Sequence, residues 1–357
     1  MHDDRELIEK RIQRELWSRV LTHVYSDRQE LAIKAGPDLA TLEPFNAGSP
    51  WGVPWGTTWF EFSGDVPPSW VDRRVEAVID LGFNPDSAGF QCEGLVVNLA
   101  EGGVITPQQG IHPRRTRYRL DPVAGPLVLN LEAASNPSFP QFQRSALGSP
   151  ETAGDIPQYR FREAALVVVD SEYEALAFDI EVLDATMLAL RLDDPRRARI
   201  RQALVAALDS SDKPEVARRV LAPMLAAQPA GSNAHHVVGI GHAHIDTAWL
   251  WPTRETKRKC TRTFASAVAL MDDYPEYKFA CSSAQHYVWI EEEHPELFAK
   301  IIERAERGQW IPVGGMWVEA DMNLPSGESL VRQIVFGQRY FEETFGERCT
   351  EVWIPDV

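Results

Sequence analysis

The residues whose types and spacing most strongly suggest chemistry lie in the stretch Gly239-Ile-Gly-His-Ala-His-Ile-Asp-Thr-Ala-Trp249. Polar side chains alternate at His242, His244 and Asp246, after a short apolar run that is typical of a buried strand. In a strand, side chains two residues apart point the same way and lie roughly 6.5 Å from each other. His244 and Asp246 could therefore bind one metal ion, because ligand bonds of about 2 Å reach inward from both sides. For His242 we favour a structural role.

Three later segments also place polar or aromatic residues directly after a strand-like run: Ser282–Gln285, Gly314–Asn323 and Ile354–Asp356. The carboxyl ends of parallel strands form the active-site face of α/β folds, so we expect these four strand ends to converge. Within the segment Gly314–Asn323, the residues Trp317, Glu319 and Asp321 are candidates for substrate contact. A solvated loop is the alternative for the two carboxylates, and a core position is the alternative for Trp249.

The elements that would position these residues alternate between strand-like and helix-like runs. The strand-like runs begin near His236, Lys278, Trp310 and Glu351, and the helix-like segments between them are Glu255–Met271, His286–Ala305 and Glu328–Phe345. This alternation predicts βα units with a parallel sheet and right-handed crossovers. The unit length suits either a barrel or an open doubly wound sheet.

The sequence before residue 231 predicts a different architecture, so the chain as a whole is α+β followed by α/β. Residues 4–25 carry a helical stripe of apolar residues that should pack against another element. Short β-prone runs separated by Pro, Gly and Asn predict a β-sandwich over 50–171. Three helices are then expected, at Tyr173–Leu190, Pro195–Leu208 and Pro214–Ala227. We therefore predict a helix and linker at 1–49, the sandwich at 50–171, a helical segment at 172–230, and the first βα units of a barrel-like α/β catalytic domain at 231–357.

Composition narrows the classes of function. The 357 residues are 44% hydrophobic and 25% charged, as in an ordinary globular protein. A net charge of −16 argues against nucleic-acid binding and against docking on anionic membranes. The charged N-terminus lacks the apolar core of a signal peptide, and no apolar run reaches the length of a membrane span. The four cysteines show no metal-binding spacing. We therefore expect a cytoplasmic protein without membrane or nucleic-acid partners.

Three motifs, HAHIDTAW, WVEADMNLPSGESLVRQ and WIPDV, resemble glycoside hydrolase family 38, the class II α-mannosidases. The stretch PWGTTWFEFSGDVP is similar to the β-rich N-terminal region of the cytosolic and bacterial branch of that family. The resemblance implies a retaining, zinc-dependent hydrolase of α-mannosides and mannose-containing oligosaccharides, with a role in mannose metabolism. Cobalt is an alternative metal.

The resemblance also implies roles for particular residues. His244 and Asp246 match metal ligands, and Asp356 matches both the catalytic nucleophile and a third ligand. Trp249 matches an aromatic residue that stacks on the sugar. Family members are longer, so the fourth ligand, a histidine, and the general acid/base are expected outside this sequence. A fourth strand exposed near the end of the chain would be a pairing template, which predicts self-association into a homo-oligomer.

Two other classes of function remain open. A metallo-β-lactamase-type site also begins with HxHxD but continues with a histidine where this chain has Thr247, and an amidohydrolase barrel would add a lysine and histidines on later strands. Neither explains the later motifs. The other class is non-catalytic, an inactive carbohydrate-binding or assembly fragment.

Overall fold

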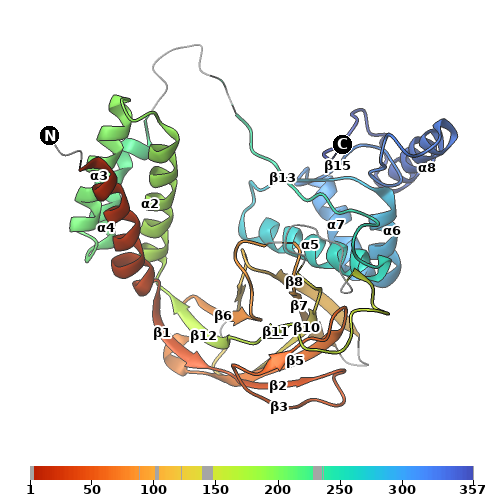
Figure 1. Ribbon diagram of the computed structural model, residues 1–357, viewed down its shortest axis with the longest axis horizontal. Helices are drawn as coiled ribbons and strands as arrows, with labels where there is room; N and C mark the ends of the chain where they lie inside the picture. Colours follow the sequence, from red (N-terminus) through yellow and green to blue (C-terminus); the bar gives the residue numbers. More distant parts are fainter. Residues whose placement is uncertain are drawn as a thin grey trace.

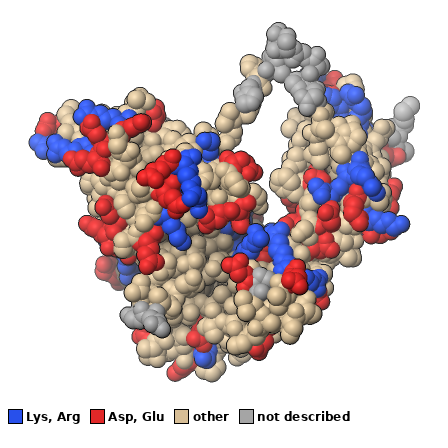
Figure 2. Space-filling model, turned by 180° about the vertical axis from the view of Figure 1, so that it is seen from behind, with Lys and Arg blue, Asp and Glu red and all other residues tan. Residues whose placement is uncertain are grey.

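The computed structural model describes residues 4–87, 89–100, 104–121, 123–138, 148–227, 235 and 237–356. Three lobes follow one another around the molecule (Figure 1): a helical lobe, a β-sandwich, and an α/β lobe that packs on one end of the sandwich. Among the described residues, no helix is both long and apolar enough to cross a membrane. On the face shown in Figure 2, acidic and basic side chains are interspersed.

The helical lobe joins the start of the chain to the segment after the sandwich. It consists of α1 (Arg5–Glu15) with its π-helical and 3-10 extensions (Leu16–Val20 and Leu21–His23), α2 (Ser171–Ala189), α3 (Pro195–Asp209) and α4 (Pro214–Leu225). The predicted N-terminal helix is thus confirmed, and its apolar stripe packs in one core with α2 to α4 through Ile12, Val20 and Leu204. Asp170 caps α2, because its carboxylate accepts hydrogen bonds from the backbone N–H groups of Glu172 and Tyr173.

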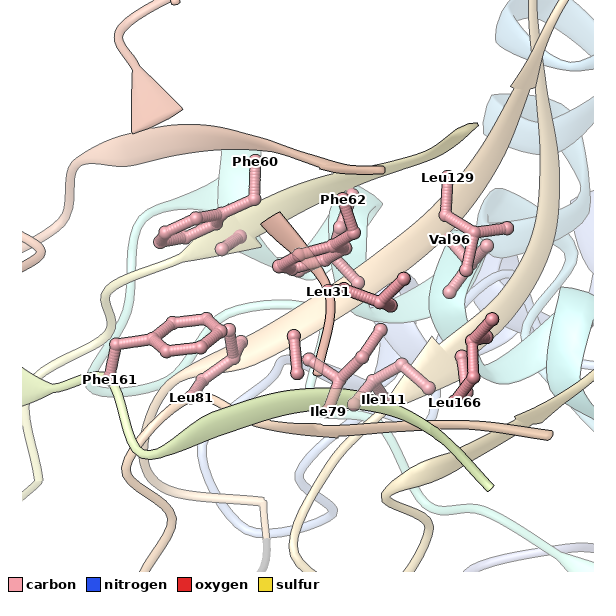
Figure 3. Close-up of a cluster of buried hydrophobic side chains, with 14 of the residues drawn as sticks. Leu31, Phe60, Phe62, Ile79, Leu81, Val96, Ile111, Leu129, Phe161 and Leu166 are labelled. Carbon is pink, nitrogen blue, oxygen red and sulfur yellow. The ribbon is translucent and has the colours of Figure 1, made fainter. Parts of the chain in front are cut away.

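The sandwich contains a six-stranded sheet in the order β3-β2-β5-β10-β7-β8, a four-stranded sheet in the order β1-β12-β6-β9, and the short pair β11-β4. The bounds are β1 Tyr25–Glu30, β2 Ala32–Gly36, β3 Glu43–Phe45, β4 Pro50–Trp51, β5 Thr57–Val66, β6 Val75–Asp80, β7 Glu93–Leu99, β8 Ile105–Ile111, β9 Arg117–Arg119, β10 Gly125–Ala134, β11 Tyr159–Arg160 and β12 Glu163–Val169. A 3-10 turn (Pro68–Trp70) follows β5. Figure 3 shows the core between the two large sheets, where Phe60, Phe62, Ile79, Phe161 and Leu166 are buried.

Three strands of the sandwich lie outside its predicted bounds of 50–171. The sandwich includes β1, β2 and β3, although the sequence placed residues 1–49 in a helix and linker. Polar and charged side chains (Ser26, Arg28 and Glu30) occupy the alternate, exposed positions of β1, so this strand lacks the apolar pattern on which the prediction depended. Within those bounds, the sequence of β8 is untypical of a strand, because it contains Pro107 and Gly110. Pairing with β7 and packing under α5 form this strand despite its low propensity.

The α/β lobe contains a parallel sheet in the order β13-β14-β15 (Gly241–His242, Phe279–Cys281 and Trp310–Pro312). Its helices are α5 (Thr253–Asp273), α6 (Ala284–Glu293), α7 (Pro295–Glu306) and α8 (Gly327–Phe345). The parallel pairing agrees with the prediction. The described residues form an open sheet, so a barrel is not seen.

Two expectations for this lobe are wrong. Residues 351–356 form no strand, so the predicted fourth strand is absent from the described chain, and the predicted self-association loses its basis. The single helix expected at 286–305 is two helices, α6 and α7, which meet at His294 and Pro295. The proline ring excludes the helical conformation at the preceding residue, and His294 accordingly has φ −140° and ψ 63°.

The α/β lobe and the sandwich share a buried interface formed mainly by α5 against β8. Leu95 and Val97 of β7 belong to the same core as Phe264 and Val268 of α5. Gly110 of β8 permits the close approach, because a Cβ atom there would lie 3.0 Å from the backbone oxygen of Arg262. The site described below therefore rests on a fixed junction between the two lobes.

Candidate active site and metal centre

His244, Asp246 and Asp356 form the cluster in which a metal could bind. One ligand atom from each residue can be chosen so that all three lie within 4.8 Å of one another. Nε2 of His244 lies 3.2 Å from Oδ1 of Asp246 and 3.7 Å from Oδ2 of Asp356. The first two residues follow β13, and Asp356 comes from the segment after α8. The cluster therefore joins residues 110 positions apart at one end of the parallel sheet.

Glu319 orients the imidazole of His244. Its carboxylate accepts a hydrogen bond from Nδ1–H of His244 and a second one from the hydroxyl of Ser282. The backbone N–H of Glu319 donates to Oγ of Ser283 at 3.1 Å, which holds the glutamate at the end of β14. With the proton on Nδ1, the lone pair of Nε2 points to the two aspartates.

Burial acts to lower the pKa of His244, but the hydrogen bonds and negative charges of Glu319 and Asp246 outweigh it and raise the pKa above its ordinary value. The negative charges of the carboxylates around this imidazole stabilise a cation bound there. The cluster thus favours either a proton or a metal ion at Nε2.

His242 serves the site indirectly, in agreement with the structural role expected for it. Its Nδ1–H donates to the carbonyl of Ala280 at 2.9 Å, and its Nε2 accepts from the indole N–H of Trp353 at 3.2 Å. Both ring nitrogens are therefore occupied. The second bond fastens the segment that carries Asp356. Gly314, at φ +84°, leaves room for this segment, because a Cβ atom there would lie 2.8 Å from Cβ of Trp353.

A pocket of about 440 Å³ opens beside the cluster. Its lining includes His244, Asp246, Trp249 and Asp356 from the α/β lobe and Gly89, Phe90 and Glu93 from the sandwich. The carboxylate side chain of Asp356 is 74% exposed, so one side of the cluster faces solvent. The volume lies in the range of small-molecule sites, about 300–1,000 Å³.

The other predicted substrate contacts lie outside this pocket lining. Glu319 is buried behind His244, as described above. Trp317 packs on the core of the lobe and donates its indole N–H to Oε1 of Gln285 at 3.2 Å. Asp321 is exposed, and its carboxylate accepts from the backbone N–H groups of Asn323 and Leu324. Phe90, Glu93 and Lys259 line the pocket but were not predicted, because nothing local in the sequence links a sandwich loop to this motif.

The donor set fits a zinc ion. Imidazole nitrogen and carboxylate oxygen are both zinc ligands, and three protein ligands leave one tetrahedral position open. Ligand atoms bound tetrahedrally at about 2.0–2.1 Å from zinc lie about 3.3 Å apart, close to the observed 3.2 and 3.7 Å. A carboxylate on the other nitrogen of the ligating histidine, here Glu319, is also typical of zinc centres.

Comparison with known proteins identifies two matching domain families. Residues 234–357 match the N-terminal domain of glycosyl hydrolases family 38, and residues 21–167 match the jelly roll domain of α-mannosidases. Residues 234–357 therefore form a family 38 N-terminal domain. This domain follows the α-mannosidase jelly roll domain in the sequence.

The similar proteins are named α-mannosidases. The chain is 35% identical to alpha-mannosidase 2C1 of Homo sapiens over 325 residues, which is 88% of this chain and 30% of that protein. It is 35% identical to alpha-mannosidase of Saccharomyces cerevisiae over 329 residues, 87% of this chain and 29% of that protein. It is 52% identical to alpha-mannosidase G of Dictyostelium discoideum over 121 residues, which is 34% of this chain and 11% of that protein. The chain thus spans about 30% of the length of the first relatives it matches.

Proposed function

We propose that this chain carries the metal-binding and nucleophile side of a zinc-dependent retaining α-mannosidase site. The observation that supports it best is the cluster of His244, Asp246 and Asp356, with Glu319 behind the histidine. The substrates would be α-mannosides and mannose-containing oligosaccharides, and cobalt is the alternative metal. The described cysteines, Cys92, Cys260, Cys281 and Cys349, are all free, which supports the proposed cytoplasmic localisation.

Each residue has a definite task in the proposed reaction. Asp356 attacks the anomeric carbon of the terminal mannose, and a covalent glycosyl ester forms as the bond to the leaving oxygen breaks. His244, Asp246 and Asp356 would hold the zinc ion, which when bound supplies Lewis-acid stabilisation of sugar oxygens. Glu319 keeps the proton of His244 on Nδ1. Trp249 presents an aromatic face to the sugar.

A retaining mechanism also needs an acid/base carboxyl group about 5–5.5 Å from the nucleophile. Among the described residues, the other carboxylates that line the pocket are Asp246 and Glu93. Asp246 belongs to the metal cluster, and Glu93 forms ion pairs with Lys259 and Arg262. We therefore assign the acid/base role to neither of them.

Zinc binding and hydrolysis together test the proposal. We expect the 357-residue chain to bind about one zinc ion by titration calorimetry. We expect it to hydrolyse an activated aryl α-mannoside only slowly, because the acid/base group is missing from the described site, and the α-anomer should appear first by NMR. Asp356→Asn should abolish turnover and weaken zinc binding. The matched control is Glu351→Gln, which makes the same carboxylate-to-amide change five residues earlier on an exposed side chain.

Different results separate the remaining alternatives. Zinc binding without turnover would favour the alternative hypothesis that this chain is a non-catalytic, carbohydrate-binding fragment. A chain that binds no zinc, or that binds it equally well after His244→Ala, would disprove the proposed metal centre.

A further inference from the structure

The loop between β6 and β7 carries a sandwich residue to the mouth of the candidate site. The ring centroid of Phe90 lies 5.1 Å from that of Trp249, and the two ring planes are inclined at 52°. Both rings are half-buried, and both line the pocket that contains Asp246 and Asp356. The jelly roll therefore supplies one wall of this pocket, and the parallel sheet supplies the other.

Internal hydrogen bonds hold this loop in shape. The side chain of Gln91 is 1% exposed. Its amide oxygen accepts from the backbone N–H of Asn84 at 2.7 Å, and its amide nitrogen donates to the carbonyls of Asn84 and Ser87 at 2.6 and 2.8 Å. A buried amide with these three bonds fixes the backbone directly before β7. Phe90, the residue before Gln91, is thereby held in place.

Lys259 of α5 connects the loop to the aromatic residues of the site. Its ammonium group donates to the carbonyl of Gly89 at 2.9 Å and pairs with Glu93 at 3.1 Å. The same group lies 5.0 Å from the ring centroid of Trp251, which in turn is 4.9 Å from that of Trp249. The buried ammonium group of Lys259 thus contacts both lobes and helps to fix the distance between Phe90 and Trp249.

We infer that Phe90 is a specificity-determining residue that binds the second pyranose of a mannosyl oligosaccharide. This inference rests on the proposed function, in which Trp249 and the metal cluster hold the terminal mannose. A single pyranose cannot stack on two aromatic rings whose planes are inclined at 52°. Two consecutive pyranoses joined by a bent linkage can each stack on one of the aromatic rings. The side chain of Phe90 has no polar atom, so it suits the apolar face of a pyranose rather than its hydroxyl edge.

Sugar binding measured without turnover tests the inference. The ligands are methyl α-mannoside and a sulfur-linked mannobiose, which resists hydrolysis, each titrated into the zinc-loaded chain. We expect the wild-type protein to bind the disaccharide about tenfold more tightly, equivalent to about 1.4 kcal/mol. Phe90→Ala should remove this preference, because it weakens binding of the disaccharide more than binding of methyl α-mannoside. Phe90→Leu keeps apolar volume without the ring and should give an intermediate value.

A matched control is Phe178→Ala, because Phe178 is 66% exposed on α2 in the helical lobe. This variant should bind both sugars like the wild-type protein. Thermal unfolding of the two alanine variants shows whether the loop change alters folding.

The outcomes distinguish the inference from the proposed function. If zinc binds but the wild type shows no preference for the disaccharide, or if Phe90→Ala retains that preference, the inference is wrong and the metal centre stands. If zinc does not bind, the proposed function fails, and the inference fails with it.

Discussion

The carboxylate of Glu319 accepts a hydrogen bond from Nδ1–H of His244. This contact leaves Nε2 of the same ring facing the two aspartates of the cluster. The pair spans 75 residues and joins the segments that follow β13 and β15. Its partner Ser282 follows β14, so each strand of the parallel sheet contributes a residue to the orientation of one imidazole.

Replacing Glu319 by glutamine should weaken zinc binding. The amide oxygen of the glutamine can still accept a hydrogen bond from His244. It lacks the negative charge that makes the imidazole a stronger metal ligand. Loss of such an outer partner typically lowers metal affinity 10–100-fold. Competition with a chromogenic chelator would measure the change, and Glu328→Gln, on an exposed face of α8, is the control. Equal zinc affinity in the Glu319→Gln variant and the wild type would contradict this role.

Trp353→Phe should reduce zinc affinity by about fivefold. The change removes only the N–H group that donates to His242, a neutral hydrogen bond worth about 1 kcal/mol. The segment that carries Asp356 would then be held less firmly. Trp17→Phe is the control, because Trp17 is 70% exposed in the helical lobe. Calorimetric zinc titration of both variants would check this, and an unchanged affinity in Trp353→Phe would show that the segment is held by other contacts.

Glu93 makes the junction between the lobes sensitive to acid. Burial acts to raise its pKa, but the charges of Lys259 and Arg262 prevail and lower it to about 2, from 4.5 for the free side chain. A folded-state pKa below the unfolded one means that the stabilisation is complete above about pH 4.5 and is lost as the pH falls toward 2.

Glu93→Gln should therefore flatten the acid side of the stability profile. It should also destabilise the protein at pH 7 by about 3 kcal/mol, because two buried cations lose a partner. Urea unfolding followed by tryptophan fluorescence from pH 7 to pH 3 would measure both effects. A variant with the wild-type pH dependence would show that Glu93 is not the group responsible.

Gly110→Val should destabilise the contact between β8 and α5. The added side chain would collide with the backbone of Arg262 and with Ser266, each 3.0 Å from the position of a Cβ atom. Overpacking of this kind costs about 1–3 kcal/mol. Gly148→Val is the matched control, since no atom lies within 4 Å of its Cβ position. Similar denaturation midpoints for the two variants would mean that the interface adjusts without cost.

The sequence was sufficient for features that depend on local spacing. The His244-x-Asp246 pattern predicted two side chains on one side of the chain, and they do lie together, although they follow the two-residue strand β13 rather than form part of it. The helices α2 to α5 and α8 were predicted within a few residues, because apolar periodicity and N-terminal prolines or acidic residues are local signals. Asp356 could be proposed only through the family resemblance, since a single aspartate carries no periodic signal.

Only the tertiary structure decided which distant groups complete the site. Glu319 lies behind His244 rather than in the pocket, and Phe90 and Lys259 bring the sandwich to its edge. These relationships depend on how β7 and β8 pack under α5, through contacts between residues more than 150 positions apart. No short sequence window contains both partners of such a contact, so residue spacing alone does not predict the pairing. The same packing forms β8 against its low strand propensity, while residues 351–356, held by the side chain of Trp353, do not form the expected strand.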